Sequence, residues 1–374
     1  MSFTNVLKEV FGFDSLRPFQ TKVVSSMLKD ENIVVISPTG SGKSLCFQLP
    51  ALLYEGITIV LSPLKSLIYD QVESLKSKGV SCELLNGDLG IRKKTILFNE
   101  LKKKCPGLKL LYTTPEMLLN NAETMPIIQN LYQRGLISRI VLDEAHCIST
   151  WGHDFRPNYL KVKYLKDYYP KVPIIALTAT ATEKVSMDIK DILGFKENIK
   201  YYDSTFLRTN LNIEIRSRGE KIIEKKETIK EIAELLKTKY KEETALLYAF
   251  SRNECEKLSD LLLEEGINVD FYHAGLSSKK RIEIQNKWIH NELQIICATI
   301  AFGMGIDKSD VRAVFHFNVP KNLEGYYQEI GRGGRDGKVC DCILYYNISD
   351  QVKYSQMNTK KKNEIREKGH DFFR

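Results

Sequence analysis

Short apolar runs alternate with amphipathic stretches through the first half of the chain. The runs include "NIVVIS", "ITIVLSP", "LKLLYTTP", "RIVLDEAH" and "VPIIALTAT". The segments between them, such as "SLCFQLPALLY", "SLIYDQVESLKSKG" and "EKVSMDIKDILGF", space their apolar residues as amphipathic helices do. Strand-like runs separated by helical segments indicate a mostly parallel sheet that is flanked by helices.

The same alternation restarts after the strongly charged stretch "RSRGEKIIEKKETIK" and continues through "TALLYAFS", "VDFYHAG", "LQIICATI", "VRAVFHF" and "CILYY". The pattern therefore predicts two α/β domains, which we place at residues 1–205 and 206–350. Residues 351–374 are expected to form a basic, helical tail, because they hold seven Lys and Arg against three Asp and Glu.

Charge and cysteine content exclude few functions, but they indicate the kind of partner and the cellular compartment. The 55 Lys and Arg against 47 Asp and Glu leave a net charge of +8, which permits a polyanionic partner without demanding one. The eight cysteines show no zinc-ligand spacing, so no zinc site is expected. The first residues, "MSFTNVLKEVFGF", lack the features of a secretion signal, and no stretch approaches the ~20 apolar residues of a membrane span. A soluble intracellular protein with reduced thiols is expected.

The segment "SPTGSGKS", residues 37–44, lies between an apolar run and a helical stretch, where a phosphate-binding loop is found. In such a loop Lys43 contributes a positive charge to the phosphates, and the Ser44 hydroxyl is a ligand for Mg²⁺. Ser37 stands where the strict pattern has its first glycine, so a plain glycine turn before a helix is the alternative. The candidate ATP-binding residues of the loop are Thr39, Gly40, Ser41, Gly42, Lys43 and Ser44.

Two adjacent carboxylates, Asp143 and Glu144, follow the apolar run "RIVL". Asp143 is a candidate second ligand for Mg²⁺, and Glu144 is a candidate base that orients and deprotonates the attacking water. An acidic pair after a strand is by itself more often a solvated loop or a helix cap. The phosphate-binding loop earlier in the chain favours the catalytic interpretation.

Nine segments occur in the order that is typical of one family, namely "FGFDSLRPFQ", "PTGSGKSLCFQLPA", "LSPLKSLIYDQV", "LLYTTPEML", "DEAHCISTWGHDFRPNY", "ALTATAT", "YHAGL", "ATIAFGMGID" and "QEIGRGGRDG". On these segments, from about Phe11 to Tyr346, the chain resembles a RecQ-family DNA helicase of the second helicase superfamily. The resemblance implies two tandem RecA-like domains, each a mostly parallel sheet flanked by helices. It also implies that ATP binds between them.

The resemblance assigns further residues to the nucleotide. Gln20 is expected to read the adenine edge while Phe13 and Arg17 pack on the faces of the base, a role for which amide, aromatic and guanidinium groups are suited. In "QEIGRGGRDG", where Gly333 replaces the family's common alanine, the nucleotide contacts are expected from three residues of the second domain. These are Gln328, which contacts the nucleotide or its water, and Arg332 and Arg335, which neutralise transition-state charge.

The segment after the acidic pair resembles the aromatic-rich loop with which RecQ-like helicases sense single-stranded DNA. Aromatic faces stack on bases irrespective of sequence, and arginine adds a contact to phosphate. Core anchoring is the alternative for Trp151 and Phe155. The candidate loop residues are Trp151, His153, Phe155 and Arg156, and the candidate residues that couple DNA to hydrolysis or strand separation are His146, Thr178 and Thr180.

Other motifs imply contacts with the phosphate backbone of nucleic acid, although several of these side chains could instead cap helices. The expected residues are Ser62, Lys65, Thr113 and Thr114 in the first domain and Ser251, Arg252, His273 and Thr299 in the second.

Three functions are compatible with these motifs. The resemblance implies an ATP- and Mg²⁺-dependent 3′ to 5′ DNA helicase, acting as a monomeric motor on single-stranded and tailed duplex DNA. An RNA helicase is the first alternative, because "DEAH" and the two-domain plan occur there too, although "TAT" and "WGHDFRPNY" argue against it. A nucleotide-gated clamp is the second, and the complete hydrolytic set argues against it.

Overall fold

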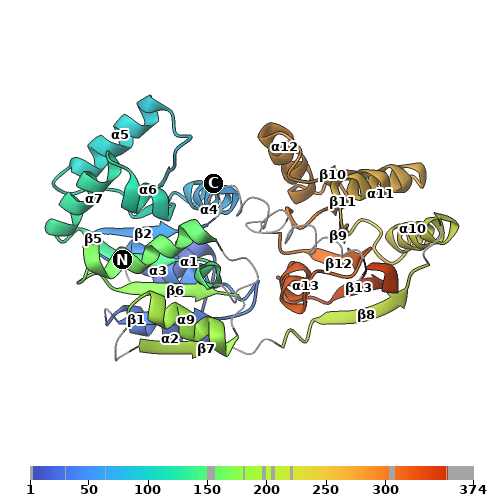
Figure 1. Cartoon of the computed structure of the whole chain (residues 1–374), viewed down its shortest axis with the longest axis horizontal. Coiled ribbons are helices and arrows are strands. Elements are labelled where there is room, and N and C mark those ends of the chain that lie inside the picture. Colours follow the sequence, from blue (N-terminus) through green and yellow to red (C-terminus); the bar gives the residue numbers. More distant parts are fainter. Residues whose placement is uncertain are drawn as a thin grey trace, which may run out of the picture. The chain divides into compact units, whose positions relative to one another are not determined.

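The chain folds into two compact units, Met1–Leu207 and Arg208–Arg374, which Figure 1 colours from blue to red along the sequence. The junction lies two residues after the boundary expected from the sequence. The computed structural model describes residues 3–29, 31–63, 65–149, 156–179, 182–195, 199–203, 207–219, 222–302, 308–350 and 352. The expected helical tail, residues 351–374, lies outside these residues except for Val352.

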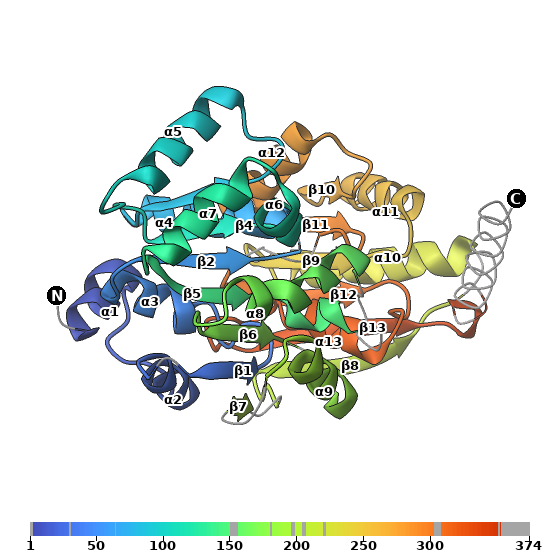
Figure 2. The same cartoon turned by 60° about the vertical axis from the view of Figure 1, so that its left-hand side comes forward.

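Unit 1 is built on a seven-stranded sheet in which neighbouring strands run parallel. Figure 2 shows β2, β5, β6, β1 and β7 one above another in this order. From one edge to the other, the strands are β3 (Cys82–Leu85), β4 (Leu110–Thr113), β2 (Ile57–Leu61), β5 (Ile137–Leu142), β6 (Ile174–Thr178), β1 (Asn32–Ile36) and β7 (Ile199–Asp203).

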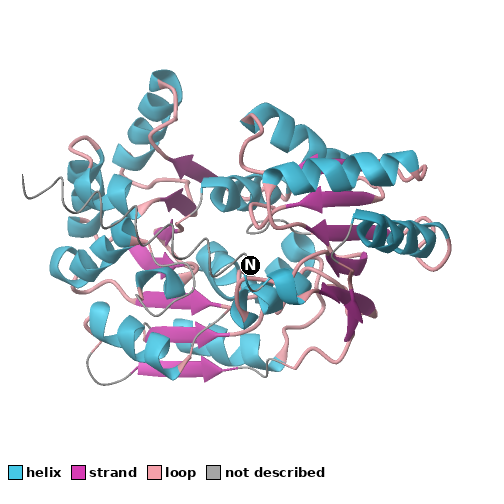
Figure 3. Cartoon of the chain, turned by 45° about the vertical axis from the view of Figure 1, so that its right-hand side comes forward, coloured by secondary structure: helices cyan, strands magenta, loops and turns pink. Residues whose placement is uncertain are grey.

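Helices connect these strands and lie on both faces of the sheet (Figure 3). They are α1 (Phe3–Phe11), α2 (Pro18–Met27), α3 (Leu45–Leu53), α4 (Lys65–Ser77), α5 (Ile91–Lys102), α6 (Pro115–Asn120), α7 (Thr124–Gln133), α8 (Leu165–Tyr168) and α9 (Glu183–Ile192), with 3₁₀ helices η1 (Ala145–Ile148) and η2 (Pro157–Tyr164).

The continuous apolar runs become strands because both faces of the sheet are covered. In β1, Val34 packs into one core, whereas its neighbours Ile33 and Val35 pack into another core on the opposite face. All five residues of β2 are buried. Successive side chains of a strand point to opposite faces, so a strand between two layers of helices must be apolar at every position.

Unit 2 repeats the plan with a six-stranded sheet whose neighbouring strands are again parallel. The order is β10 (Val269–Tyr272), β11 (Ile295–Ala298), β9 (Thr244–Tyr248), β12 (Val311–His316), β13 (Cys340–Tyr346) and β8 (Leu211–Ser217). The helices are α10 (Ile222–Lys237), α11 (Arg252–Glu264), α12 (Ser278–Ile289) and α13 (Leu323–Ile330). The expected α/β fold of two helix-flanked sheets is therefore confirmed.

The candidate site residues follow the carboxyl ends of the strands. Ser37 comes directly after β1, Ser62 after β2 and Asp143 after β5, while Thr113 and Thr178 are the last residues of β4 and β6. Parallel strands bring their carboxyl ends to one edge of a sheet, where open α/β sheets bind ligands. Residues far apart in the sequence thus meet at one edge of unit 1.

Candidate nucleotide and nucleic-acid site

The loop between β1 and α3 has the conformation that a phosphate-binding loop needs. Gly40 and Gly42 have φ angles of +79° and +84°, which favour glycine. A Cβ atom on Gly42 would lie 2.6 Å from Gln20 Nε2, so a side chain there would displace the Gln20 amide from the loop. The glycines therefore allow a close approach to the backbone of this loop.

The polar groups of the loop fit a nucleotide phosphate and Mg²⁺. Lys43 Nζ donates to Ser37 O at 2.6 Å and to Pro38 O at 3.0 Å, so the ammonium group stays on the loop. The Ser41 hydroxyl is buried without a hydrogen-bond partner among the described residues, which favours a polar ligand. Ser44 directly precedes α3 and its side chain makes no capping hydrogen bond, so its hydroxyl is available to Mg²⁺.

Two of the three residues expected at the adenine, Arg17 and Gln20, contact this loop. Arg17 Nη1 donates to Ser41 O at 2.9 Å and to Gly40 O at 3.3 Å. Gln20 Nε2 donates to Gly42 O at 3.0 Å, and its Oε1 accepts from Arg17 N at 2.8 Å. A Gln amide has two N–H groups and two acceptor lone pairs, so one of each stays available to a base. Phe13 is 52% exposed, which leaves its ring open for stacking.

Asp143 is held by two donors at the end of β5. Its Oδ1 accepts from Glu144 N at 3.1 Å, and its Oδ2 accepts from Gln71 Nε2 at 3.0 Å. Burial raises the pKa of the Asp143 carboxyl, an effect that a bound cation would oppose.

Sequence reasoning did not identify Gln71 as a site residue. Its signal is an amide on the apolar face of α4, where Ile68 and Val72 are buried. A polar residue in such a position needs a buried partner. Gln48 Nε2 continues the network, lying 3.5 Å from Gln71 Oε1 and 3.2 Å from Tyr112 Oη. The network thus links α3, α4 and β4 to the candidate metal ligand.

Glu144, His146 and Thr178 form a second cluster. His146 Nδ1 lies 2.9 Å from Thr178 Oγ1 and 3.3 Å from Glu144 Oε2, and both His146 and Thr178 are fully buried. Glu144 has the left-handed backbone angles φ 52° and ψ 47°. Such a conformation costs a glutamate about 1–3 kcal/mol and is found most often at functional sites.

Of the aromatic-rich segment, Trp151, His153 and Phe155 lie outside the described residues, as does Thr180 of the coupling set. Arg156 lies at the segment's end, and its Nη1 donates to Pro63 O at 2.9 Å. Three residues later, Tyr159 is buried, and its hydroxyl lies 2.7 Å from Asp143 O and 2.9 Å from Leu61 O. Arg156 and Tyr159 therefore contact the main chain at the ends of β2 and β5, beside Asp143.

The expected backbone-contact residues of unit 1 differ in exposure. Ser62 has a buried hydroxyl without a hydrogen-bond partner among the described residues. Thr113 is fully buried and donates to Leu85 O at 2.8 Å, so its side chain serves the sheet in this structure. Thr114 precedes α6 and makes no capping hydrogen bond. Lys65 begins α4, but its side chain lies outside the described residues.

In unit 2, the expected contacts follow β9, β10 and β11. Ser251 caps α11 in this structure, because its side chain accepts from Glu254 N. Arg252 is exposed. His273 is buried, with Nε2 2.8 Å from Glu256 Oε1 and its ring stacked on Phe271. Thr299 is buried, and its hydroxyl accepts from Ala301 N at 3.4 Å.

The arginine-containing turn, residues 331–335, follows α13. Gln328 is half-buried on α13, Arg332 is 7% exposed and Arg335 is half-buried. Arg208 and Asn210, which the motif analysis did not single out, bind the main chain of this turn. Their signal in the sequence is weak, because their partners lie more than 120 residues away.

The structure explains why the turn has glycine at position 333. A Cβ atom there would lie 2.2 Å from Cys340 Sγ, and Cys340 is fully buried in the unit 2 core. The contact is with a packed side chain on β13, which has no room to move aside.

We expect Gly333→Ala to lower the free energy of unfolding by about 1–3 kcal/mol, the usual cost of overpacking a core. Replacing Cys340 by alanine in the same chain removes the opposing sulfur and should restore most of this loss. Thermal denaturation of both single variants and the double variant measures the effect. An unchanged melting temperature for Gly333→Ala would show that the turn relaxes freely.

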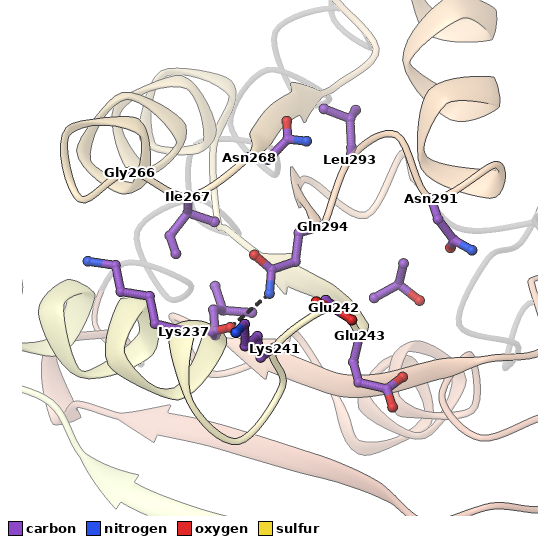
Figure 4. Close-up of a pocket in the computed structure, with 12 residues that line it drawn as sticks. Lys237, Lys241, Glu242, Glu243, Gly266, Ile267, Asn268, Asn291, Leu293 and Gln294 are labelled. Atoms are coloured by element: carbon purple, nitrogen blue, oxygen red, sulfur yellow. Dashed lines mark hydrogen bonds between the residues drawn. The ribbon is translucent and has the colours of Figure 1, made fainter.

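A pocket of about 370 Å³ lies elsewhere in unit 2 (Figure 4). Its lining includes Thr244 and Leu293, beside the amino ends of β9 and β11. Gln294 also lines the pocket, and its Nε2 donates to Leu236 O and Tyr240 O at 2.8 and 2.9 Å. The residues expected to bind nucleotide or nucleic acid follow the opposite ends of these strands, so this pocket is not part of the candidate site.

The described residues were also compared with the requirements of a metal-binding cluster and of a membrane-spanning helix. Within the described ranges, no three or more His, Cys, Asp or Glu side chains gather as a metal site would require. Among the helices that the structure describes, none has both the length and the apolar character of a membrane span.

Two helicase family models match the chain in order, one in each unit. The DEAD/DEAH box helicase family matches residues 17–188, and the helicase conserved C-terminal domain matches residues 224–337. The crystal structure of DUF1998 helicase MrfA bound to DNA has a TM-score of 0.76 and 18% identity, over 96% of this chain and 53% of that one. At this identity the likeness concerns the fold alone.

Closer relatives are found by sequence. The RecQ-like DNA helicase blm-1 of Caenorhabditis elegans is 44% identical over 94% of this chain and 35% of its own length. The ATP-dependent helicase SGS1 of Saccharomyces cerevisiae is 44% identical over 96% of this chain and 25% of its own length. The chain thus spans about a quarter to a third of these two relatives. With this identity along nearly its whole length and both helicase families matched in order, the chain belongs to the RecQ helicase family.

Proposed function

We propose that this chain is an ATP-dependent DNA helicase and translocase that couples ATP hydrolysis to 3′ to 5′ movement on single-stranded DNA. The observation that carries the proposal is the cluster of Glu144, His146 and Thr178 at the sheet edge that also bears the phosphate-binding loop. His146 contacts both the hydrolytic carboxylate Glu144 and Thr178 at the end of the neighbouring strand β6. A shift of Glu144 during ATP hydrolysis can therefore displace His146 and be transmitted to β6. The polarity follows from the family alone.

ATP is the proposed nucleotide, held by the 39–44 loop with Phe13, Arg17 and Gln20 at the base. Ser44 and Asp143 are the proposed ligands of Mg²⁺, which would neutralise charge on the phosphates. Glu144 accepts a proton from the attacking water, and Lys43 stabilises phosphate charge. Gln328, Arg332 and Arg335 complete the hydrolytic set, in which the two arginines neutralise charge in the transition state.

Single-stranded and tailed duplex DNA are the proposed partners, bound inside the cell by a monomeric motor. Trp151, His153, Phe155 and Arg156 are proposed to sense the strand. The anchoring of Arg156 and Tyr159 on the ends of β2 and β5 supports a path from that segment to Glu144. The backbone track is proposed to include Ser62, Lys65, Thr113, Thr114, Ser251, Arg252, His273 and Thr299, with Thr180 as a further relay residue.

DNA is favoured over RNA because the similar protein blm-1 is, by its name, a RecQ-like DNA helicase. A clamp without turnover is disfavoured because Lys43, Glu144, Arg332 and Arg335 are all present. These alternatives predict different responses of the ATPase to polymers.

We expect single-stranded DNA to stimulate ATP hydrolysis severalfold, RNA to stimulate it less, and rising salt to weaken DNA binding steeply. Steady-state ATPase with each polymer, and with none, separates the three functions. Unwinding of matched duplexes with 3′ or 5′ tails then tests polarity, for which a 3′ tail should be required. Stimulation by RNA alone would favour an RNA helicase, and a preference for 5′ tails would contradict the proposed direction.

A further inference from the structure

Two residues at the start of unit 2 hold the arginine-containing turn through its main chain. Arg208 Nη2 donates to Gly333 O at 2.9 Å and to Gly334 O at 2.8 Å, and its Nη1 lies 3.4 Å from Gly331 O. Asn210 Nδ2 donates to Gly334 O and to Lys338 O, both at 2.8 Å. Together these side chains bind the carbonyl groups on both sides of Arg332.

The two side chains also fix each other and are fixed by β13. Arg208 Nε donates to Asn210 Oδ1 at 3.1 Å, and Asn210 O accepts from Cys340 N at 2.9 Å. The planar guanidinium group presents its donors in a rigid fork, so several converging carbonyls determine its orientation. The clamp is therefore a connected network rather than a set of separate contacts.

The turn itself is built to accept this clamp. Gly334 has a φ angle of +54°, and a Cβ atom there would lie 2.5 Å from both Asn210 Nδ2 and Lys338 O. Three glycines in four residues leave little side-chain packing to hold the turn. Glycine has the greatest conformational freedom of any residue, so such a turn needs external hydrogen bonds to keep one conformation.

We propose that Arg208 and Asn210 are positioning residues that hold Arg332 and Arg335 in the geometry that ATP hydrolysis requires. The proposal rests on the function proposed above, in which those two arginines neutralise transition-state charge. Arg208 contributes its fork to the carbonyl groups of the turn. Its loss should therefore slow the chemical step without weakening ATP binding.

The test is Arg208→Lys, which keeps the positive charge but loses the fork. We expect kcat for DNA-stimulated ATP hydrolysis to fall about 10- to 100-fold, because displacement of a catalytic group by about 1 Å has effects of this size. KM for ATP should stay close to that of the unsubstituted chain. Arg216→Lys is the matched control, because Arg216 lies on the neighbouring β8 and pairs with Glu214 and Glu231 away from the turn. Its kcat should be unchanged.

A double-variant cycle distinguishes positioning from a general structural role. If Arg208 acts through Arg332, then Arg208→Lys should cause little further loss of single-turnover rate in a chain that already carries Arg332→Ala. The proposal would be overturned if Arg208→Lys lowered the single-turnover rate by the same factor in the unsubstituted chain and in the Arg332→Ala chain. A normal kcat for Arg208→Lys would also overturn it. Should Arg208→Lys fail to melt cooperatively, Asn210→Ala is measured in the same cycle and is expected to show the same pattern.

Failure of the inference is distinct from failure of the proposed function. If Arg332→Ala hydrolyses ATP normally, the arginines have no catalytic role and the proposed function loses that part. If Arg332→Ala is inactive while both Arg208→Lys and Asn210→Ala are normal, only the clamp is wrong.

Discussion

Replacing Lys43 with alanine is expected to lower ATP hydrolysis by about 10²- to 10³-fold, the usual effect of removing one preorganised group that stabilises transition-state charge. The ammonium group already lies within the loop, on Ser37 O and Pro38 O, so little rearrangement is needed for it to meet a phosphate. Binding of single-stranded DNA should change only a few-fold, because Lys43 serves the nucleotide. ATPase rates and DNA-binding isotherms measure the two effects.

Lys308→Ala is the control for Lys43→Ala. Lys308 is also a lysine whose ammonium group donates to a main-chain carbonyl, Ile289 O at 3.2 Å, and it is only 5% exposed. Its loss should lower the melting temperature while kcat is retained, which separates a loss of stability from a loss of catalysis. Normal turnover by Lys43→Ala would remove the phosphate-binding assignment.

Most of the fold could be predicted from hydrophobic pattern, and the strands that the pattern did not mark share one property. The strands β3, β7 and β8 lie at the edges of their sheets. Every residue of β8 is half-buried or exposed, and none is fully buried. An edge strand is covered less completely than a central one, so its sequence need not be an apolar run. Central strands such as β2 and β6, buried at every position, were evident from their composition.

The candidate site divides in a similar way. Residues such as Ser37, Asp143 and Thr178 were accessible to sequence reasoning because they end or directly follow apolar runs, and the topology of a parallel sheet brings such positions together. The residues Gln71, Arg208 and Asn210 act through contacts between segments more than 70 residues apart. Only the folded chain shows those contacts.

Thr113 shows that position along a strand does not by itself reveal what a side chain contacts. It stands at the carboxyl end of β4, as expected for a contact with nucleic acid, yet its hydroxyl is buried and donates to Leu85 O. Alternation along a strand decides which of two neighbours faces outward. Thr114, the next residue, is half-buried and makes no capping hydrogen bond, so it is the better candidate of the pair.

Glu144→Gln is expected to bind ATP but to hydrolyse it about 10²- to 10⁴-fold more slowly, the range usual for loss of a general base. Glutamine has nearly the same shape as glutamate, so the left-handed backbone at this position and the packing around His146 should be retained. The amide cannot accept a proton from water. Single-turnover hydrolysis and binding of a fluorescent ATP analogue together distinguish slow chemistry from lost affinity.

Glu242→Gln provides a matched control for this substitution. Glu242 also has a left-handed backbone, with a φ angle of +64°, but it is exposed at the far end of unit 2 from the candidate site residues. The same change of side chain at the same kind of backbone should leave hydrolysis unaltered there. If Glu144→Gln instead fails to bind nucleotide or melts at a much lower temperature, Glu144 holds the structure around His146 and Thr178. The water-activating role would then need another residue.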